Sequence, residues 1–200
     1  MTTYCGGALV TESSTAVRSA RASRGFTQQH LAELTDVDQA RISRIENGRD
    51  ADFSTVQRVL AGAGHRLYAL PLQRDDAASV AVEIRERLRA EDRERALRAL
   101  LQLNDNLVAE HGLLRGVLGL AEPEPTRSRA WDAAIAALVA WRLSEEGLPL
   151  PTWVARPERY LPVAVVLEID PADPAPPESE VPEEFLRRGV HVWRDTFASV

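Results

Sequence analysis

Cysteine is almost absent from this 200-residue sequence, because Cys5 is the only one. A single cysteine excludes an intramolecular disulfide and any zinc site built from several thiolates. No apolar run approaches the roughly 18 residues that a membrane-spanning helix needs, and the first ten residues have neither the basic segment nor the apolar core of a secretory signal. We therefore expect a cytoplasmic protein without a membrane anchor.

Lysine is missing altogether, and all 24 basic residues are arginine, a bias that a GC-rich genome produces. The charges are unevenly spread. Through Arg74 the chain has nine arginines and seven acidic residues, whereas from Asp75 onward it has fifteen arginines and twenty-three acidic residues. A slightly basic head on an acidic body is compatible with one face that binds nucleic acid, although charge alone does not establish such a face.

Signatures of catalysis are also missing. The sequence contains no HExxH, GxSxG, Walker or GxGxxG motif. The four histidines are scattered, with no HxH pair and no cysteine partner, so a metal site is not expected; they are His30, His65, His111 and His191. We therefore predict no enzymatic activity, no metal and no cofactor.

Three regions differ in composition. Residues 1–74 hold short amphipathic segments separated by polar turns, and residues 75–121 are rich in Leu, Ala, Arg and Glu, as in a helical connector or dimerisation region. Residues 122–200 hold eleven of the twelve prolines. Within them, residues 170–184 are acidic and proline-rich, which favours an extended or mobile linker. We expect a mainly α protein with a helical middle and a small α+β module at the C-terminus.

The middle region has helical spacing. Apolar residues four apart between Val80 and Leu88 predict one helix, and Asp92 is placed to cap the next. An alternating 3/4 spacing of a heptad seam follows, in Leu97, Leu100, Asn104, Leu107, His111, Leu114 and Leu118. The seam serves either self-association, with Asn104 and His111 setting the register, or one core helix that tolerates two polar positions. Three glycines after His111 favour the core helix.

The last region is expected to hold a helix and short strands. Residues 128–145 have one apolar face, and Gly147 followed by Pro149 ends the predicted helix. Residues 160–169 form a short β-branched apolar run, which is typical of a strand. Apolar residues alternate at Val190 and beyond, but the fold of this module cannot be named from the pattern.

A helical motif lies between residues 27 and 48, which read TQQHLAELTDVDQARISRIENG. Thr27 is placed to cap a first helix, and Asp38 to cap a second short helix that stops at Gly48. A tight turn, DVD, joins the two helices, and its valine is expected to be buried. Two short helices joined by so short a turn describe a helix-turn-helix.

These residues closely resemble the Xre/Cro/C1-type helix-turn-helix, through TQxxLA, the hydrophobic turn residue and ISRIENG. The resemblance covers residues 14–72, about a third of the chain. It implies a lambda-repressor-like bundle with further helices over residues 15–24 and 53–60, and it implies binding to double-stranded DNA. Asp36 replaces the usual turn glycine, and Asp38 stands where a small polar residue is usual, so that its charge is expected to reduce affinity for phosphate.

The resemblance assigns two kinds of DNA contact by position. Base edges are expected to meet Gln39, Ala40 and Arg44. Contacts that include phosphates and set the register are expected from Gln28, Arg41, Ser43, Asn47 and Arg49. Glu46 is expected to be an internal partner of Arg21 or Arg24.

Residues 64–72, GHRLYALPL, are expected to form one short strand. A helix-turn-helix followed by such a strand looks like the HipB-like antitoxins, in which the strand pairs with its copy in a second subunit. The resemblance thus implies a homodimer on an inverted-repeat operator. Pairing with the C-terminal strand of the same chain is the alternative, since a lone strand needs a partner edge.

Two functions fit these features. The first, which we favour, is the antitoxin and autorepressor of a type II toxin-antitoxin system, with an acidic C-terminal region that neutralises a toxin protein. The second is a free-standing Xre-family regulator whose C-terminal region dimerises or senses a small ligand. The C-terminal region contains four aromatic residues that could serve either function, namely Trp153, Tyr160, Phe185 and Trp193. In an antitoxin they would suit the interface with the toxin. The alternative is that they form a small core of the C-terminal module.

Overall fold

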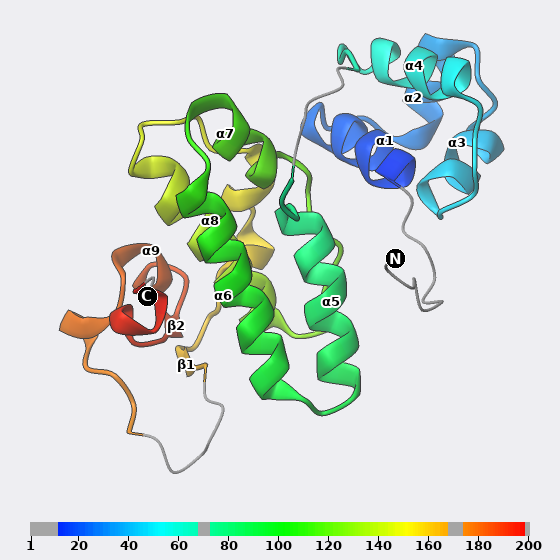
Figure 1. Cartoon of the computed structure of the whole chain (residues 1–200). Coiled ribbons are helices and arrows are strands. Elements are labelled where there is room, and N and C mark those ends of the chain that lie inside the picture. The colour runs from blue at the N-terminus through cyan, green and yellow to red at the C-terminus, as the bar shows by residue number, and fades with distance from the viewer. Residues whose placement is uncertain (1–11, 68–72, 168–173, 199–200) are drawn as a thin grey trace. The chain divides into compact units, whose positions relative to one another are not determined.

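The computed structural model describes residues 12–67, 73–167 and 174–198, and these residues are mainly helical (Figure 1). The predicted mainly α class is confirmed. The chain divides into two units, residues 1–71 and residues 72–200. Among the described residues, no helix is long and apolar enough to cross a membrane.

The N-terminal unit is a bundle of four helices, which are α1 (Glu12–Ser23), α2 (Gln28–Thr35), α3 (Gln39–Glu46) and α4 (Phe53–Gly62). Each helix buries a narrow apolar stripe in one shared core. The core includes Val17, Leu31, Val37, Ile42, Ile45, Val56, Val59 and Leu60. Helices of eight to twelve residues are too short to be stable alone, so this common core holds them in place.

The predicted caps on both sides of the turn are confirmed. The Thr27 hydroxyl accepts the His30 amide at 3.1 Å, and the Asp38 carboxylate accepts the Ala40 amide at 2.9 Å. Asp36 has the left-handed conformation, with φ of 52°, which Asp adopts more readily than most residues. Val37 is buried beneath the turn. The turn thereby fixes the direction in which α3 leaves α2.

The predicted strand at residues 64–72 falls partly outside the described residues. Gly64 follows α4 with a positive φ of 75°, and residues 65–67 are not in a strand. Residues 68–72 lie outside the described part of the chain. Both alternatives for the pairing of this strand therefore stay predictions.

The C-terminal unit is built on four longer helices, α5 (Ala77–Arg89), α6 (Arg93–Ala109), α7 (Gly112–Leu120) and α8 (Arg129–Ser144). α5 and α6 form an antiparallel hairpin (Figure 1). α8 is the central element, because every residue from Trp131 to Ala140 is buried. Its many alanines let neighbouring elements approach on all sides. The prediction of this helix at residues 128–145 is confirmed.

The predicted heptad seam is wrong in its second half. Asn104 lies on the buried face of α6 and is 1% exposed, as the core-helix alternative requires. However, α6 ends at Ala109, and His111 is the N-cap residue of α7 with a side chain 77% exposed. Gly112, with φ of 55°, starts the new helix in a new direction. The 3/4 spacing therefore spans two helices rather than one.

The rest of the unit consists of short elements that pack on α8. They are η1 (Thr152–Ala155), η2 (Pro157–Arg159), β1 (Val165–Val166), η3 (Glu178–Glu180), α9 (Glu183–Leu186), β2 (Val190–His191) and η4 (Arg194–Phe197). β1 and β2 form a parallel pair. Segments before and after residue 121, the predicted boundary, contribute to one hydrophobic core. Within the predicted linker at 170–184, Val181 and Pro182 are buried, so this part of it is packed.

The C-terminal aromatic residues support the core alternative rather than an exposed interface. Trp153 and Phe185 are fully buried, and Phe185 packs against Trp141 and Phe197 with ring centroids 6.4 Å and 5.1 Å away. Tyr160 and Trp193 are half-buried. The interface alternative is therefore wrong for Trp153 and Phe185, which form part of the core.

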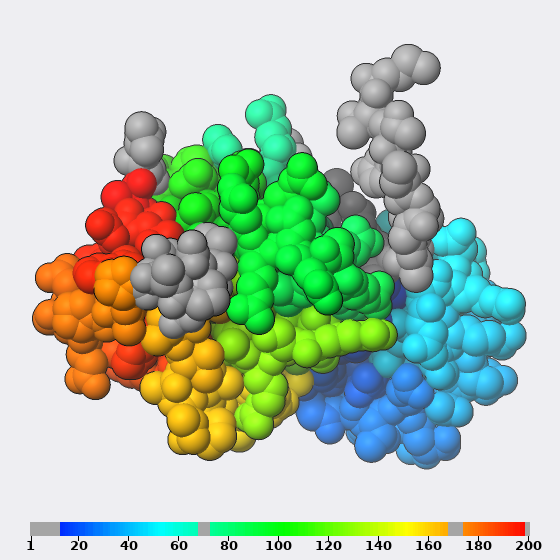
Figure 2. Space-filling view, turned by 90° about the horizontal axis from the view of Figure 1, so that it is seen from below, coloured from blue at the N-terminus to red at the C-terminus, as the bar shows by residue number. Residues whose placement is uncertain are grey.

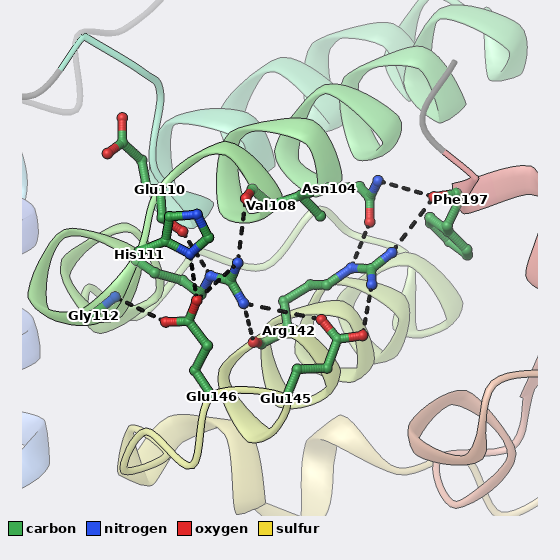
Figure 3. A network of polar contacts seen from close by, with 10 residues as sticks. Asn104, Val108, Glu110, His111, Gly112, Arg142, Glu145, Glu146 and Phe197 are labelled. Carbon is green, nitrogen blue, oxygen red and sulfur yellow. Dashed lines mark hydrogen bonds and ion pairs between the residues drawn. The ribbon is translucent and has the colours of Figure 1, made fainter.

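Two buried arginines tie α6, α7 and α8 together (Figure 3). The Arg142 Nε donates to Asn104 Oδ1 at 2.8 Å, and its NH1 donates to Glu145 at 2.8 Å. Arg115 donates to the backbone oxygens of Glu110, Arg142 and Val108 at 2.8, 3.0 and 3.2 Å. Burial lowers the pKa of Arg142 from its ordinary value. Such charges are tolerated inside because nearly all of their donors find acceptors.

Candidate nucleic-acid interface

The predicted recognition surface is one side of α3. Ile42, Ile45 and Glu46 point into the N-terminal unit and are buried. The opposite side exposes Ala40, Arg41, Arg44 and Asn47, with Gln39 and Ser43 half-buried beside them. A helix with 3.6 residues per turn separates the two sets in this way. The predicted base-reading residues Gln39, Ala40 and Arg44 thus lie together on one helix.

A buried carboxylate anchors this helix from behind. Glu46 is 4% exposed, and both of its oxygens accept hydrogen bonds from Arg21 of α1, Nε at 2.6 Å and NH2 at 2.9 Å. Arg18 of the same helix donates to the Glu46 backbone oxygen. The expected internal partner of Glu46 is therefore Arg21 rather than Arg24.

The same carboxylate orients two predicted DNA contacts. Gln28 Nε2 donates to Glu46 Oε2 at 2.8 Å, and Gln39 Nε2 in turn donates to Gln28 Oε1 at 2.9 Å. The chain of donors and acceptors sets which way each side-chain amide faces. Gln28, expected as a phosphate contact at the start of α2, also holds Gln39 in place. A preset orientation reduces the entropy lost when the side chain binds.

Arg41 is held by a residue that the sequence interpretation did not single out. Its NH2 lies 2.7 Å from Asp52 Oδ2. Asp52 caps α4 by accepting the Thr55 amide at 2.9 Å, and hydrogen bonds from Ser54 and Thr55 lower its carboxyl pKa far below the usual range. The available signal was the sequence DFST, an N-cap residue followed by a hydroxyl residue three positions on.

The other predicted contacts are near the end of α3. The Arg44 Nε donates to the Ala40 backbone oxygen at 3.1 Å, and the Asn47 amide lies 3.4 Å from the Ser43 hydroxyl. Arg49 follows Gly48, which ends the helix with φ of 88°, and is exposed. All eight predicted contact residues are thus on α3, just after it, or at the first residue of α2. Their contact with DNA stays a prediction.

A metal-binding site finds no support in the described part of the chain. No group of three or more His, Cys, Asp or Glu side chains there could hold a metal ion. Around α3 the exposed charges are of both signs, since Asp36 and Asp38 lie near the arginines. A site of this kind is suited to recognition by hydrogen bonds and charge.

Comparison with known families agrees with this geometry. Residues 17–62, from the middle of α1 to the last residue of α4, match the family model described as helix-turn-helix. The N-terminal unit is therefore similar to helix-turn-helix domains of the Xre/C1 type, and the match supports a sequence-specific DNA-binding regulator. Comparison of the whole chain with curated proteins and with solved structures finds no significant match.

Proposed function

We propose that this protein represses transcription by binding an inverted-repeat operator as a homodimer, with α3 in the major groove of each half-site. The observation that carries the proposal is Gln39 held by the Glu46–Gln28 chain, on the same helix as the exposed Arg44. Two polar side chains that can read bases are thereby presented on one rigid helix.

The residue types suggest how bases would be read. A glutamine amide can pair with adenine, an arginine with guanine, and an alanine methyl can meet the methyl group of thymine. Gln39, Arg44 and Ala40 would fill these roles. Arg41 and Arg49 would contact phosphates on either side and set the register, since such contacts position a protein without reading sequence.

The dimer is proposed because one short helix can contact only a few base pairs. α3 has eight residues, and its exposed side reaches a few base pairs. Two copies related by a two-fold axis would read two half-sites whose centres lie about one helical turn, roughly 34 Å, apart. A footprint on the selected DNA measures this spacing. Protection of a single unrepeated half-site would contradict the dimer.

The test begins with selection of binding sites from random duplex DNA by the full-length protein. Arg44→Ala should then lose about 1–3 kcal/mol on the selected site and relax the base preference at one position. Arg58→Ala is the matched control, because it removes the same charge from an exposed position on α4. Equal loss on selected and random DNA would make Arg44 a backbone contact, and no sequence preference at all would overturn the proposal.

An antitoxin role is the second candidate function. It is supported by an exposed apolar face on α7, where Leu113 and Leu120 are 71% and 60% exposed. The unit that carries this face has an excess of acidic residues, as a partner with a basic surface would require. A toxin protein covering this face would explain why leucines are left in water.

Co-expression tests the antitoxin role. The product of a neighbouring gene should stop growth when expressed alone, and the full-length protein should restore growth. Leu113→Ser combined with Leu120→Ser should weaken the rescue, whereas Arg44→Ala should leave it intact because DNA binding is not needed to cover a toxin. A neighbouring product that is harmless alone would leave the repressor function without an antitoxin role.

A further inference from the structure

A cavity of about 570 Å³ lies in the C-terminal unit, between the turn that joins α5 to α6 and the segment that leads into α8. Figure 2 shows the face on which these segments lie next to one another. The lining residues are Arg85, Leu88, Arg89, Glu91, Arg93, Thr126, Arg127, Ser128 and Trp131. Four of them are arginines and one is acidic.

Three of the four arginines of this cavity differ from the other arginines in the unit. Among the described residues of the C-terminal unit, every other arginine makes an ion pair or a hydrogen bond, for example Arg87 with Glu83 and Arg98 with Glu94. Within the same described residues, three arginines have a side chain that makes neither an ion pair nor a hydrogen bond, namely Arg89, Arg93 and Arg127. All three line the one cavity.

The fourth arginine is also incompletely satisfied. Arg85 NH1 lies 2.9 Å from Glu124, but its Nε is buried and has no hydrogen-bond partner. A buried donor without an acceptor costs free energy that a ligand oxygen could restore. Arg85 thus adds a fourth guanidinium to the lining, one of whose donors has no partner in the protein.

The local electrostatics favour an anion. Three unpaired like charges around one cavity repel one another, and Glu91 is the single acidic residue in the lining. Residues 75–200 have an excess of acidic residues overall, so this cavity reverses the sign of its surroundings. Ser128 is the N-cap residue of the sixteen-residue α8 and makes no side-chain capping bond, and the first turn of that helix favours negative charge.

Backbone conformation marks the same place. In the described part of the chain, three residues other than glycine have a positive φ: Asp36, Glu91 at 58° and Arg127 at 72°. Two of the three, Glu91 and Arg127, line this cavity. Such conformations cost free energy and are often found at binding sites.

We propose that this cavity binds a small molecule carrying two or more phosphate groups, such as a nucleoside polyphosphate. Planar guanidinium groups match phosphate oxygens two at a time, which is why arginine recognises phosphate better than a point charge does. The volume is in the usual range for small-molecule sites, roughly 300–1,000 Å³. Leu88 and Trp131 supply an apolar wall for the organic part of the ligand.

Calorimetric titration of the full-length protein without DNA tests this directly. ATP and inorganic pyrophosphate should bind saturably, with an affinity that falls as salt rises, and adenosine should not bind. Arg89→Gln with Arg127→Gln should weaken ATP binding at least tenfold. The matched control is Arg95→Gln with Arg98→Gln, which removes two exposed, paired arginines from α6 and should leave the affinity unchanged.

Two results would overturn the proposal. Equal weakening in the control variant would mean non-specific attraction by charge. The second result concerns DNA. If ATP bound neither variant, and a random-sequence duplex bound the control variant more tightly than the Arg89/Arg127 variant, these arginines would be contacts to the DNA backbone. Because the titration contains no DNA, a failure of operator binding by α3 would not change its outcome.

Discussion

Arg21 and Glu46 are 25 residues apart in the sequence, yet the guanidinium of one faces both carboxylate oxygens of the other, at 2.6 and 2.9 Å. The pair joins α1, the first helix of the bundle, to the end of α3. Gln28 and Gln39 extend it toward the exposed side of α3. One buried carboxylate therefore supports both the fold of the N-terminal unit and the orientation of Gln28 and Gln39, two predicted DNA contacts.

Glu46→Ala should destabilise the N-terminal unit by about 3 kcal/mol or more, because removing one partner leaves the other charge poorly solvated. The variant should also lose the base preference attributed to Gln39, which no longer has a fixed partner. Calorimetric unfolding of the full-length protein measures the first effect, and selection from random DNA the second. Glu33→Ala, an exposed carboxylate on α2, should change neither; if it matched Glu46→Ala, the anchor would have no special role.

Asp52→Asn should increase DNA affinity several-fold. Asparagine still caps α4, but the loss of charge releases Arg41 from its 2.7 Å ion pair and removes a negative charge from the DNA-facing side. Binding measured over a range of salt concentrations should show a steeper dependence than in the unsubstituted protein. Asp50→Asn removes a nearby exposed charge that forms no ion pair with Arg41. An equal gain in both variants would indicate a general charge effect.

Two glycines of α7 should respond oppositely to alanine. A Cβ on Gly119 would lie 2.8 Å from the Val139 side chain, whereas a Cβ on Gly116 would meet nothing within 4 Å. Gly119→Ala should therefore cost about 1–3 kcal/mol of stability through overpacking against α8. Gly116→Ala should gain roughly 0.5–1 kcal/mol from the better helix propensity of alanine. Denaturant unfolding compares the two, and stabilisation by both would mean that α7 is not packed on α8.

The free energy of unfolding should depend on pH through the ionisation of Glu146. Hydrogen bonds from His111 and then from the Gly112 amide lower the pKa of this carboxyl, with Arg115 contributing by its charge. A lowered folded-state pKa stabilises the protein above the ordinary glutamate pKa, and this stabilisation is lost as the pH falls through the folded-state value.

His111→Ala should therefore unfold at a lower temperature near neutral pH and lose less stability on acidification than the unsubstituted protein. Melting curves collected between about pH 7 and about pH 3 measure the difference. His191→Ala is a useful reference, because His191 is far from Glu146 in sequence and lies in β2. Parallel pH profiles for the unsubstituted protein and His111→Ala would contradict this assignment.

The sequence predicted the helix-turn-helix well because its determinants are local. Caps at Thr27 and Asp38, a left-handed turn residue and inward apolar positions are each decided by neighbours within a few residues. The same holds for the helix at residues 128–145. The heptad seam failed for a related reason: a 3/4 pattern does not reveal that the chain turns at Gly112 and begins a second helix with the same periodicity.

What tertiary structure alone decided are the contacts between residues distant in sequence. The choice of Arg21 over Arg24 for Glu46, the tether between Arg41 and Asp52, and the burial of Phe185 against Trp141 depend on how elements pack, which no local pattern contains. The arginine cavity is the clearest case, since in the sequence its arginines look like any other charged helix surface. They become a site because the chain brings Arg127 to Arg89 and Arg93 and leaves all three without a carboxylate, and charges interact through space rather than along the chain.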